Sequence, residues 1–213
     1  MDQLAFEAAI RRLCASDADL ARVVSAHGIP VMWVRPEGFP SLVLLVLEQQ
    51  VSLASAAAAY RRLSVRLGGL RPDAVLAATP EELRADGVSR QKDRYLRALA
   101  TALLTSDLDL DALGTLEDRE ARAALMAVTG IGRWTADVYL LACLRRPDLW
   151  PVGDRALQVA TAEALGLPVL PSAAALDAVG DRWRPHRSAA ARVLWHGYLA
   201  RRGRVETPSS LLA

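Results

Sequence analysis

A helix-start carboxylate and a glycine-rich turn some twenty residues before it are the features of this sequence that could do chemistry. Asp154 precedes the amphipathic stretch 155–165, so its carboxylate would stand at a helix N-terminus, where the helix dipole favours negative charge. The segment 128–135, Val-Thr-Gly-Ile-Gly-Arg-Trp-Thr, predicts a tight turn that opens a second helix. The backbone N–H groups at the start of that helix would form an anion site that suits a phosphate.

Each feature also has a purely structural interpretation. Gly130 and Gly132 would allow backbone angles that residues with a Cβ resist, and would let a ligand approach the backbone closely. A Gly-x-Gly pair between helices is equally typical of a helix C-cap followed by a turn. Asp154 could likewise be a plain N-cap. Neither motif taken alone separates a functional role from a structural one.

Composition excludes several classes of protein. A hydrophobic content of 52% excludes a disordered chain, and purely apolar runs such as 42–47 are too short to span a membrane. The N-terminus lacks the pattern of a secretory signal, so we expect a cytoplasmic, nucleoid-associated protein with no membrane partner. Two scattered cysteines and three histidines cannot build a typical zinc or iron–sulfur site.

The charge is small, but it is unevenly distributed. The net charge is +2, and the positive excess lies from Arg133 onward, where the turn and Asp154 also lie. This distribution fits a phosphate-facing side, although a basic surface is often only solvated. Lys92 is the only lysine among the 26 basic residues.

Helical periodicity and capping residues predict an all-α fold, with no sustained alternation typical of strands. Thr79, followed by Pro80 and Glu82, forms a capping-box signature at a helix start, and Ser89 opens another helix. The expected helices are 2–14, 17–26, 41–50, 52–67, a start at 79, 89–104, 117–127, a start near 133, 154–165, 172–179 and 185–201.

Together these motifs resemble the helix-hairpin-helix DNA glycosylases, and specifically their 3-methyladenine DNA glycosylase II (alkylation-repair) branch. The resemblance covers roughly residues 35–200. It is carried by the segments 44–52 (Gln-Gln-Val-Ser), 87–96 (glycine, basic and apolar), 125–140 (the hairpin), 150–157 (with Asp154) and 182–189 (Trp-x-Pro-x-Arg-Ser).

The resemblance implies a two-lobed helical fold with a DNA-binding cleft between the lobes and no N-terminal β-domain. We therefore expect a single domain, 1–213, with lobes of roughly 35–115 and 116–200 plus the N-terminal helices, and a flexible tail, 202–213. The implied partner is double-stranded DNA containing damaged bases, and we expect a monomer.

The implied activity is hydrolysis of the N-glycosidic bond of an alkylated purine after the nucleotide has been flipped out of the duplex. Asp154 matches the catalytic position, where a carboxylate stabilises an oxocarbenium-like sugar and orients a water. A cationic base would bind an aromatic pocket by stacking and cation–π attraction. The pocket candidates are Trp134, foremost, then Tyr139, Trp150 and Trp33.

The resemblance also implies contacts to the DNA strand. Gln50, or Gln49, would enter the space that the extruded base vacates, although some members use an apolar wedge there. No cofactor is required, but main-chain carbonyls of Met126, Val128 and Gly130 match those that hold Na⁺ or K⁺ in the family. The expected DNA-binding residues are Thr129, Gly130, Ile131, Gly132, Arg133, Thr135, Arg187 and Ser188.

Bifunctional relatives place a lysine at the position of Trp134, where it forms a Schiff base and cuts the strand. Its absence here predicts a monofunctional hydrolase that leaves an abasic site, with Lys92 on another helix and its charge directed outward. Two alternatives remain open at this point. One is a related glycosylase for another lesion, such as hypoxanthine or uracil, and the other is a non-catalytic helix-hairpin-helix DNA-binding module.

Overall fold

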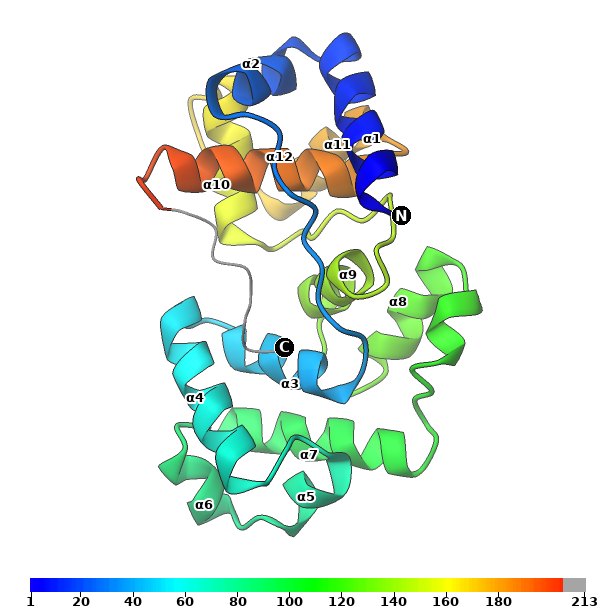
Figure 1. Ribbon diagram of the computed structural model, residues 1–213, viewed down its shortest axis with the longest axis vertical. Helices are drawn as coiled ribbons and strands as arrows, with labels where there is room; N and C mark the ends of the chain where they lie inside the picture. The colour runs from blue at the N-terminus through cyan, green and yellow to red at the C-terminus, as the bar shows by residue number, and fades with distance from the viewer. Residues whose placement is uncertain (205–213) are drawn as a thin grey trace. The chain divides into compact units, whose positions relative to one another are not determined.

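The structure, a computed structural model, describes residues 1–204, and within these residues every regular element is a helix (Figure 1). The chain divides into two compact units, which are described separately. Unit 1 comprises residues 1–34 and 140–204, and unit 2 comprises residues 35–139. The division falls within one helix, and residues 116–139 lie in the same compact unit as residues 35–115.

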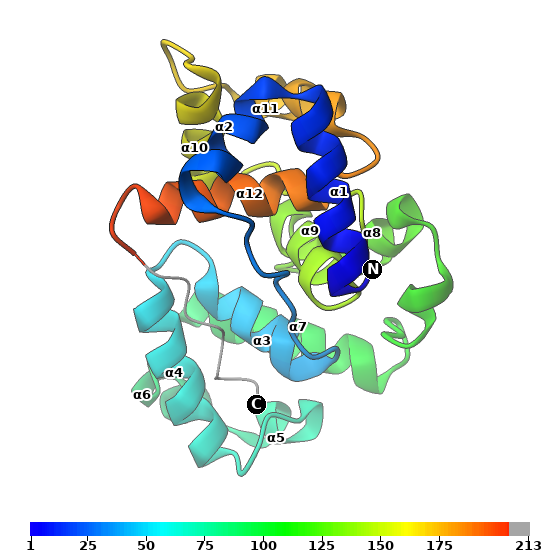
Figure 2. The same ribbon diagram turned by 45° about the horizontal axis from the view of Figure 1, so that its top comes forward.

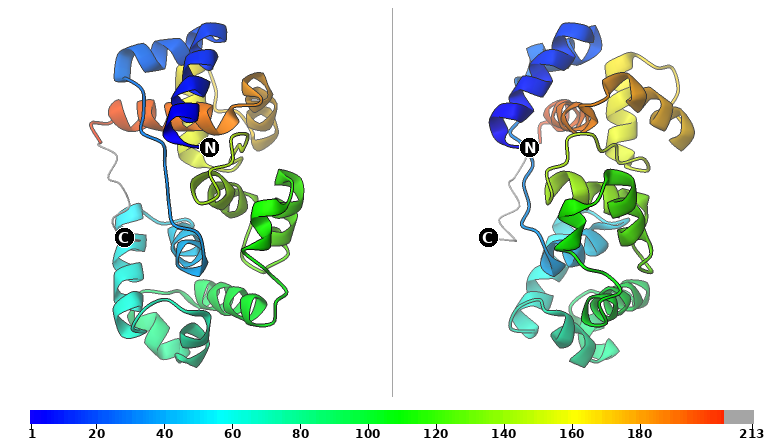
Figure 3. Two further views of the ribbon diagram at one scale, coloured as in Figure 1. Left: turned by 45° about the vertical axis from the view of Figure 1, so that its right-hand side comes forward. Right: turned by 90° about the vertical axis from the view of Figure 1, so that its right-hand side faces the viewer.

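Unit 1 is built around α12 (Arg187–Ala200), whose residues from 187 to 195 are all buried. A helix that is covered on all sides belongs in a core. Helix α12 packs against α1, α2 and α10, as the blue, yellow and orange helices of Figures 2 and 3 show. The other helices of unit 1 are α1 (Gln3–Ser16), α2 (Ala18–His27), α10 (Arg155–Leu165), α11 (Ala173–Gly180) and the 3-10 helix η2 (Asp181–Trp183).

Unit 2 is built around α3 (Phe39–Glu48) and α7 (Arg90–Leu104), which pack against each other. Helix α3 is buried from 41 to 47 because its sequence is apolar on every side, and α4 covers it as well. Helix α7 also contacts α5 and α6. The other elements are α4 (Leu53–Arg66), α5 (Pro72–Ala77), α6 (Pro80–Ala85), η1 (Ala112–Thr115) and α8 (Asp118–Met126); α9 (Arg133–Ala142) begins in unit 2 and ends in unit 1.

The capping residues read from the sequence are confirmed. The Thr79–Glu82 capping box is complete, and the side chains of Ser89 and Asp154 accept hydrogen bonds from the first turns of α7 and α10. Three short elements, α5, η1 and η2, were not predicted, because six, four and three residues are too few to show a helical period. Helix α3 begins at Phe39, earlier than expected, because Pro40 fits the first turn of a helix.

The predicted tail, 202–213, lies outside the described residues except for 202–204. Arg202 belongs to the ordered part of unit 1: it pairs with Glu163 at 2.8 Å and lies over the ring of Tyr198.

Candidate functional site

The hairpin between α8 and α9 lies in unit 2. After α8, the Val128 N–H donates to Leu125 O, and the Ile131 N–H donates to Val128 O at 3.1 Å, so the chain turns tightly before α9. The Ala136 N–H then donates to Gly132 O at 3.0 Å, which places Gly132 at the start of α9. This is the predicted helix, tight turn and helix, and its second helix offers an N-terminus that favours an anion.

The two hairpin glycines are needed for different reasons. Gly130 has φ +94°, and a Cβ at this position would lie 2.2 Å from Tyr95 Cγ, so only glycine fits. Gly132 has no positive φ, and a Cβ there would meet nothing within 4 Å. The expectation that both need unusual backbone angles is therefore wrong for Gly132. Its lack of a side chain instead leaves the backbone at the α9 N-terminus open to close approach.

The glutamines that follow α3 lie against this hairpin. Gln49 Nε2 donates to Gly130 O and to Thr135 Oγ1, each at 3.0 Å, so both amide protons are used within unit 2. Gln50 is exposed and has φ +57°, a left-handed conformation that a residue with a side chain rarely adopts. The structure thus brings together two segments that the sequence shows only as separate motifs. Gln49 is an anchor, and Gln50 is the residue presented to solvent.

The other residues expected to bind DNA in the hairpin differ in exposure. Thr129 is exposed, whereas Ile131 is buried. Thr135 is 2% exposed and accepts the bond from Gln49, so it is turned into unit 2. Arg133 Nε lies 3.5 Å from the buried Asp137, which also pairs with Arg122. Among these side chains, Thr129 is open to a ligand, and Arg133 is half-exposed beside Asp137. Ile131 and Thr135 are buried and stabilise the hairpin.

Arg187 and Ser188 have a structural task in unit 1 that was not expected from the sequence. Arg187 is 8% exposed, and its guanidinium donates to both carboxylate oxygens of Asp148, at 2.9 Å each. Ser188 is 2% exposed; it donates to Arg146 O and accepts from the Leu149 N–H. Both side chains are occupied in fixing the loop 146–149 to the start of α12. Contact of Arg187 and Ser188 with DNA stays a prediction beside this structural task.

Asp154 lies in unit 1 as the N-cap of α10, and its carboxylate is half-exposed. Its Oδ1 accepts the Leu157 N–H at 2.7 Å and the indole N–H of Trp195 at 3.1 Å. A small hollow of about 130 Å³ opens beside it, lined by Gly153, Asp154, Arg155, Gln158, Ala173 and Leu176. A carboxylate that is oriented by two donors and still reaches the surface can stabilise a developing positive charge.

Trp195 was not identified from the sequence, where a tryptophan within the last helix is typical of a core residue. It is 8% exposed, and its ring meets that of Trp33 edge to face, with centroids 5.7 Å apart. The Arg192 guanidinium lies 6.0 Å from the Trp33 ring and donates to Val31 O. Trp33 therefore packs against Trp195, the residue whose indole donates to Asp154, although Trp33 lies in a proline-rich loop far away in sequence.

The remaining aromatic candidates lie in different environments. Trp134 is half-buried in the first turn of α9. Tyr139 is fully buried, and its hydroxyl accepts the Gly38 N–H at 2.9 Å. Trp150 is 1% exposed; its indole N–H donates to Leu176 O, and its ring packs on Trp183. Trp150 packs in the core of unit 1 and Tyr139 is fully buried, and their place in a base pocket stays a prediction.

Lys92 is half-buried, and its ammonium donates to Leu47 O at 2.6 Å. Burial lowers the pKa of this lysine. The expectation that its charge is directed outward is therefore wrong. The sequence pattern of α7 could not reveal this contact, because the partner is a backbone carbonyl of another helix.

No group of three His, Cys, Asp or Glu side chains that could hold a metal ion occurs among the described residues. The carbonyls expected to bind an alkali cation are partly engaged. Val128 O accepts the Ile131 N–H, and Gly130 O accepts Gln49 Nε2. A carbonyl oxygen has two lone pairs, so these contacts leave room for a cation as a further partner.

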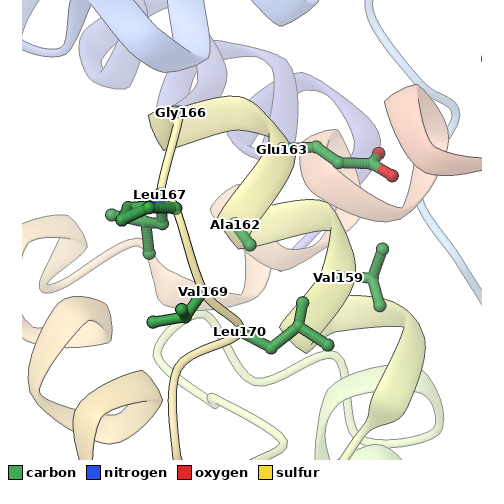
Figure 4. A pocket seen from close by; sticks show the side chains of 8 residues that line it. Val159, Ala162, Glu163, Gly166, Leu167, Val169 and Leu170 are labelled. Atoms are coloured by element: carbon green, nitrogen blue, oxygen red, sulfur yellow. The ribbon is translucent and has the colours of Figure 1, made fainter.

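A larger hollow, of about 430 Å³, lies at the C-terminal end of α10 (Figure 4). Apolar side chains of the loop that follows Gly166 form its walls, together with Val159 and Ala162. Its one ionisable group, Glu163, is paired with Arg201 and Arg202. Asp154 does not line it, so this hollow has no link to the carboxylate chemistry.

A family model described as HhH-GPD superfamily base excision DNA repair protein matches residues 43–176, which include the glutamine turn, the hairpin and Asp154. The chain belongs to the HhH-GPD superfamily. This HhH-GPD protein is 39% identical over 108 residues to the Mycobacterium tuberculosis "Probable bifunctional transcriptional activator/DNA repair enzyme AlkA", a match that covers 51% of this chain and 21% of the relative. The chain thus spans about a fifth of the length of that relative.

Solved structures of the same class share the fold. The Schizosaccharomyces pombe 3-methyladenine DNA glycosylase (Mag1), in complex with abasic DNA, has a TM-score of 0.81 and 25% identity, over 88% of this chain and 94% of its own. DNA-3-methyladenine glycosidase from Bacillus halodurans has a TM-score of 0.78 and 29% identity, over 96% and 95%. The predicted all-α fold and the superfamily are confirmed. No helix in the described part of this HhH-GPD chain is long and apolar enough to cross a membrane.

Proposed function

We propose that this protein is a monofunctional DNA glycosylase that excises alkylated purines, of the 3-methyladenine and 7-methylguanine class, from double-stranded DNA. The observation that carries the proposal is Asp154. In a chain of the HhH-GPD superfamily, a half-exposed carboxylate stands at a helix N-terminus, held by Trp195 and the Leu157 N–H. The names of the two similar solved structures supply 3-methyladenine as the lesion.

The reaction asks little of the protein beyond Asp154. An alkylated purine such as 7-methylguanine carries positive charge, so it leaves readily and needs no strong general acid. The sugar becomes oxocarbenium-like as the glycosidic bond lengthens, and the Asp154 carboxylate stabilises that charge and orients a water for attack. The product is a free base and an abasic site in an intact strand.

The hairpin and the glutamine turn supply the grip on DNA. The start of α9, left open by Gly132, suits a backbone phosphate. Gln50 is presented by an adjacent turn in a strained backbone conformation, and strain of this kind clusters at functional sites. We assign Gln50 as the residue that enters the gap left by the extruded nucleotide, with Gln49 as its support.

Two aromatic groups are candidates for contact with the extruded base. Trp134, in the first turn of α9, is half-buried and follows the phosphate-binding turn directly. Trp33 is half-buried and lies beside Trp195 in the unit that carries Asp154. An electron-rich ring attracts a cationic base through stacking and cation–π interaction. We place Trp134 first because it matches the family's tryptophan.

An assay for abasic sites on methylated DNA tests the proposal. Duplex DNA treated with a methylating agent is incubated with the protein, and strand breaks are counted after alkali. Breaks that require both protein and alkali support a monofunctional glycosylase. A protein that binds this DNA but leaves no abasic sites would be a non-catalytic DNA-binding module. A panel of oligonucleotides with methylated purines, hypoxanthine or uracil then fixes the lesion, and excision of uracil or hypoxanthine alone would contradict the alkylpurine assignment.

Three subsidiary proposals complete this assignment. We expect a monomer, which analytical ultracentrifugation tests, and a cytoplasmic, nucleoid-associated location, which a fluorescent fusion tests. We also propose that Na⁺ or K⁺ binds the hairpin carbonyls of Met126, Val128 and Gly130. A melting temperature that is no higher in KCl than in tetramethylammonium chloride of equal ionic strength would contradict the cation site.

A further inference from the structure

Helix α7 contacts both parts of the DNA grip through two residues that are neighbours on one helical face. Lys92 and Tyr95 are three residues apart, a spacing that puts their side chains side by side. Lys92 Nζ donates to Leu47 O at 2.6 Å. Leu47 is in the last turn of α3, where helix carbonyls lack intrahelical partners and a positive charge complements the dipole. The lysine therefore caps the helix end that leads directly into the glutamine turn.

Tyr95 supports the hairpin in the same way. Gly130 packs so closely on its ring that an added Cβ would lie 2.2 Å from Cγ and 2.5 Å from Cδ1. The Tyr95 hydroxyl is itself held by Gln91, whose Nε2 donates to it at 2.6 Å. The hairpin backbone thus packs on the Tyr95 aromatic ring, which belongs to α7 and is held in place by another α7 residue, Gln91.

Gln49 links the end of α3 to the hairpin. It immediately follows α3, and its amide donates to Gly130 O and Thr135 Oγ1. The contacts therefore form a ring within unit 2, from α7 through Lys92 to the end of α3, through Gln49 to the hairpin, and through Tyr95 back to α7. Gln50 is the next residue after this ring, exposed and in a left-handed conformation.

We propose that Lys92 is a positioning residue for the extrusion of the damaged nucleotide. By capping α3 from α7, it fixes the turn that presents Gln50 at a set spacing from the phosphate-binding hairpin. The hairpin and the turn that carries Gln50 then move as one rigid unit. Binding energy gained at the phosphate is thereby available to insert Gln50 into the duplex. This inference rests on the proposed glycosylase function and deepens it. It assigns the single lysine of the chain to base extrusion and not to covalent chemistry.

Arg97 offers a matched control on the same helix. Like Lys92, it is a basic residue of α7 that donates to carbonyls at the end of another helix, Leu76 O and Ala78 O next to α5. Its hydrogen bonds go to these two carbonyls and to Asp93, and none of them reaches the end of α3 or the hairpin. Lys92→Met removes one positive charge and the bond to Leu47 O. Arg97→Met removes one positive charge and the bonds to Leu76 O, Ala78 O and Asp93, so the control loses more contacts, but only Lys92→Met opens the ring.

The first experiment compares single-turnover excision of 7-methylguanine from two duplexes. In one the lesion is paired with cytosine, and in the other it faces a tetrahydrofuran abasic analogue, so that less work is needed to extrude it. Lys92→Met should slow excision from the paired duplex by about tenfold or more, and from the unpaired duplex by less than about threefold. Arg97→Met should slow both equally, and Lys92→Arg, which keeps a cationic donor, should recover most of the loss. Equal slowing of both duplexes by Lys92→Met would overturn the inference.

The second experiment does not depend on excision. A duplex that contains a tetrahydrofuran site flanked by 2-aminopurine reports unstacking as a rise in fluorescence when the protein binds. Wild type and Arg97→Met should give the rise, and Lys92→Met should bind with a smaller rise. A full rise with Lys92→Met, or no rise with wild type, would overturn the inference. If wild type gives the rise but excises 7-methylguanine from neither duplex, the proposed function has failed while the role of Lys92 stands or falls by fluorescence.

Discussion

The Asp154 carboxylate combines two properties that are usually separate. As an N-cap it accepts the Leu157 N–H, and it also accepts the indole N–H of Trp195, yet it remains half-exposed. A cap alone would need only the first contact. The second donor, Trp195, belongs to α12, 41 residues further along the chain, and it fixes the orientation of the carboxylate. This added constraint favours a chemical role over a purely structural one.

Changing Asp154 to Asn should separate binding from chemistry. Asparagine caps a helix about as well as aspartate, so the fold of unit 1 should survive. Without a negative charge to stabilise the sugar cation, single-turnover excision should fall by on the order of a hundredfold or more. Affinity for lesion DNA should stay near that of wild type. The measurement is a pair of single-turnover and gel-shift titrations.

Asp2→Asn is the matched control, because Asp2 caps α1 through the Ala5 N–H in the same way. It should leave the excision rate unchanged. If Asp154→Asn excised at a rate close to that of wild type, the carboxylate mechanism would be wrong.

The second residue-scale prediction concerns the product. Schiff-base chemistry needs an uncharged amine at the sugar, but the ammonium of Lys92 is engaged by Leu47 O. Arginine cannot replace it, because its guanidinium stays protonated in proteins. The product strand should therefore remain intact until alkali is added, and borohydride should trap no covalent protein–DNA complex. A trapped band that is lost in Lys92→Met would move this protein to the lyase branch.

Among the structural elements, the hairpin uses its two glycines differently. Gly130 allows close packing on Tyr95, and Gly132 leaves the backbone at the start of α9 accessible. Gly130 has both a positive φ and the Tyr95 ring against it, so Gly130→Ala should destabilise unit 2. Gly132 has open space around it and an ordinary backbone, so a side chain there changes the surface and not the fold. The same Gly-x-Gly motif therefore contains two positions with opposite expected responses to substitution.

Gly132→Val should weaken binding to damaged and undamaged duplexes alike, by about tenfold, because it blocks close approach of a phosphate without touching a base. The slope of log affinity against log salt should become shallower by about one. Salt titrations by fluorescence anisotropy measure both. Gly114→Val serves as the control, since a Cβ there also meets nothing within 4 Å. Unchanged affinity in folded Gly132→Val would exclude the hairpin as the phosphate site.

In the molecule as a whole, polar contacts join segments that are distant in sequence but lie in the same compact unit. In unit 1, Asp17 stands between α1 and α2 and accepts the indole N–H of Trp183 at 2.8 Å, from the far end of the chain. Arg182 lies 2.7 Å from the same carboxylate. The N-terminal helices are thereby fixed to the C-terminal part of the unit.

This tie predicts acid sensitivity. Burial by itself would raise the pKa of Asp17, but bonds from the Leu20 N–H, Trp183 and Arg182 outweigh it and hold that pKa below its usual value. The folded state then binds fewer protons than the unfolded state in this range. The stabilisation is present above the ordinary aspartate pKa and is lost as pH falls toward the lowered folded value.

Asp17→Asn keeps the helix cap but not the charge, so it should cost about 1–3 kcal/mol of stability at neutral pH. It should also flatten the loss of stability as the solution is acidified. Urea denaturation across acidic pH measures both, with the neighbouring Asp19→Asn as control, since Asp19 is the more exposed partner of Arg22 and Arg182. An unchanged pH profile in Asp17→Asn would exclude this carboxylate as the acid-sensitive group.

The sequence alone determined the helical class, the caps and the motifs. Helical periodicity and capping chemistry are local, so Thr79, Ser89 and Asp154 could be assigned their places from a few neighbouring residues. The hairpin turn and the place of Asp154 at a helix start were likewise predictable, because they depend on residue type and short spacing.

Tertiary structure decided which of those residues are accessible and what holds them. Trp150, Arg187 and Ser188 carry functional residue types but are buried among partners distant in sequence. The contacts of Trp195 with Asp154 and of Lys92 with the end of α3 join segments far apart in sequence, so they exist only in the folded chain. Periodicity identifies the side of a helix that is buried, but it carries no information on the element that packs there, since packing is set by contacts between segments far apart in the chain.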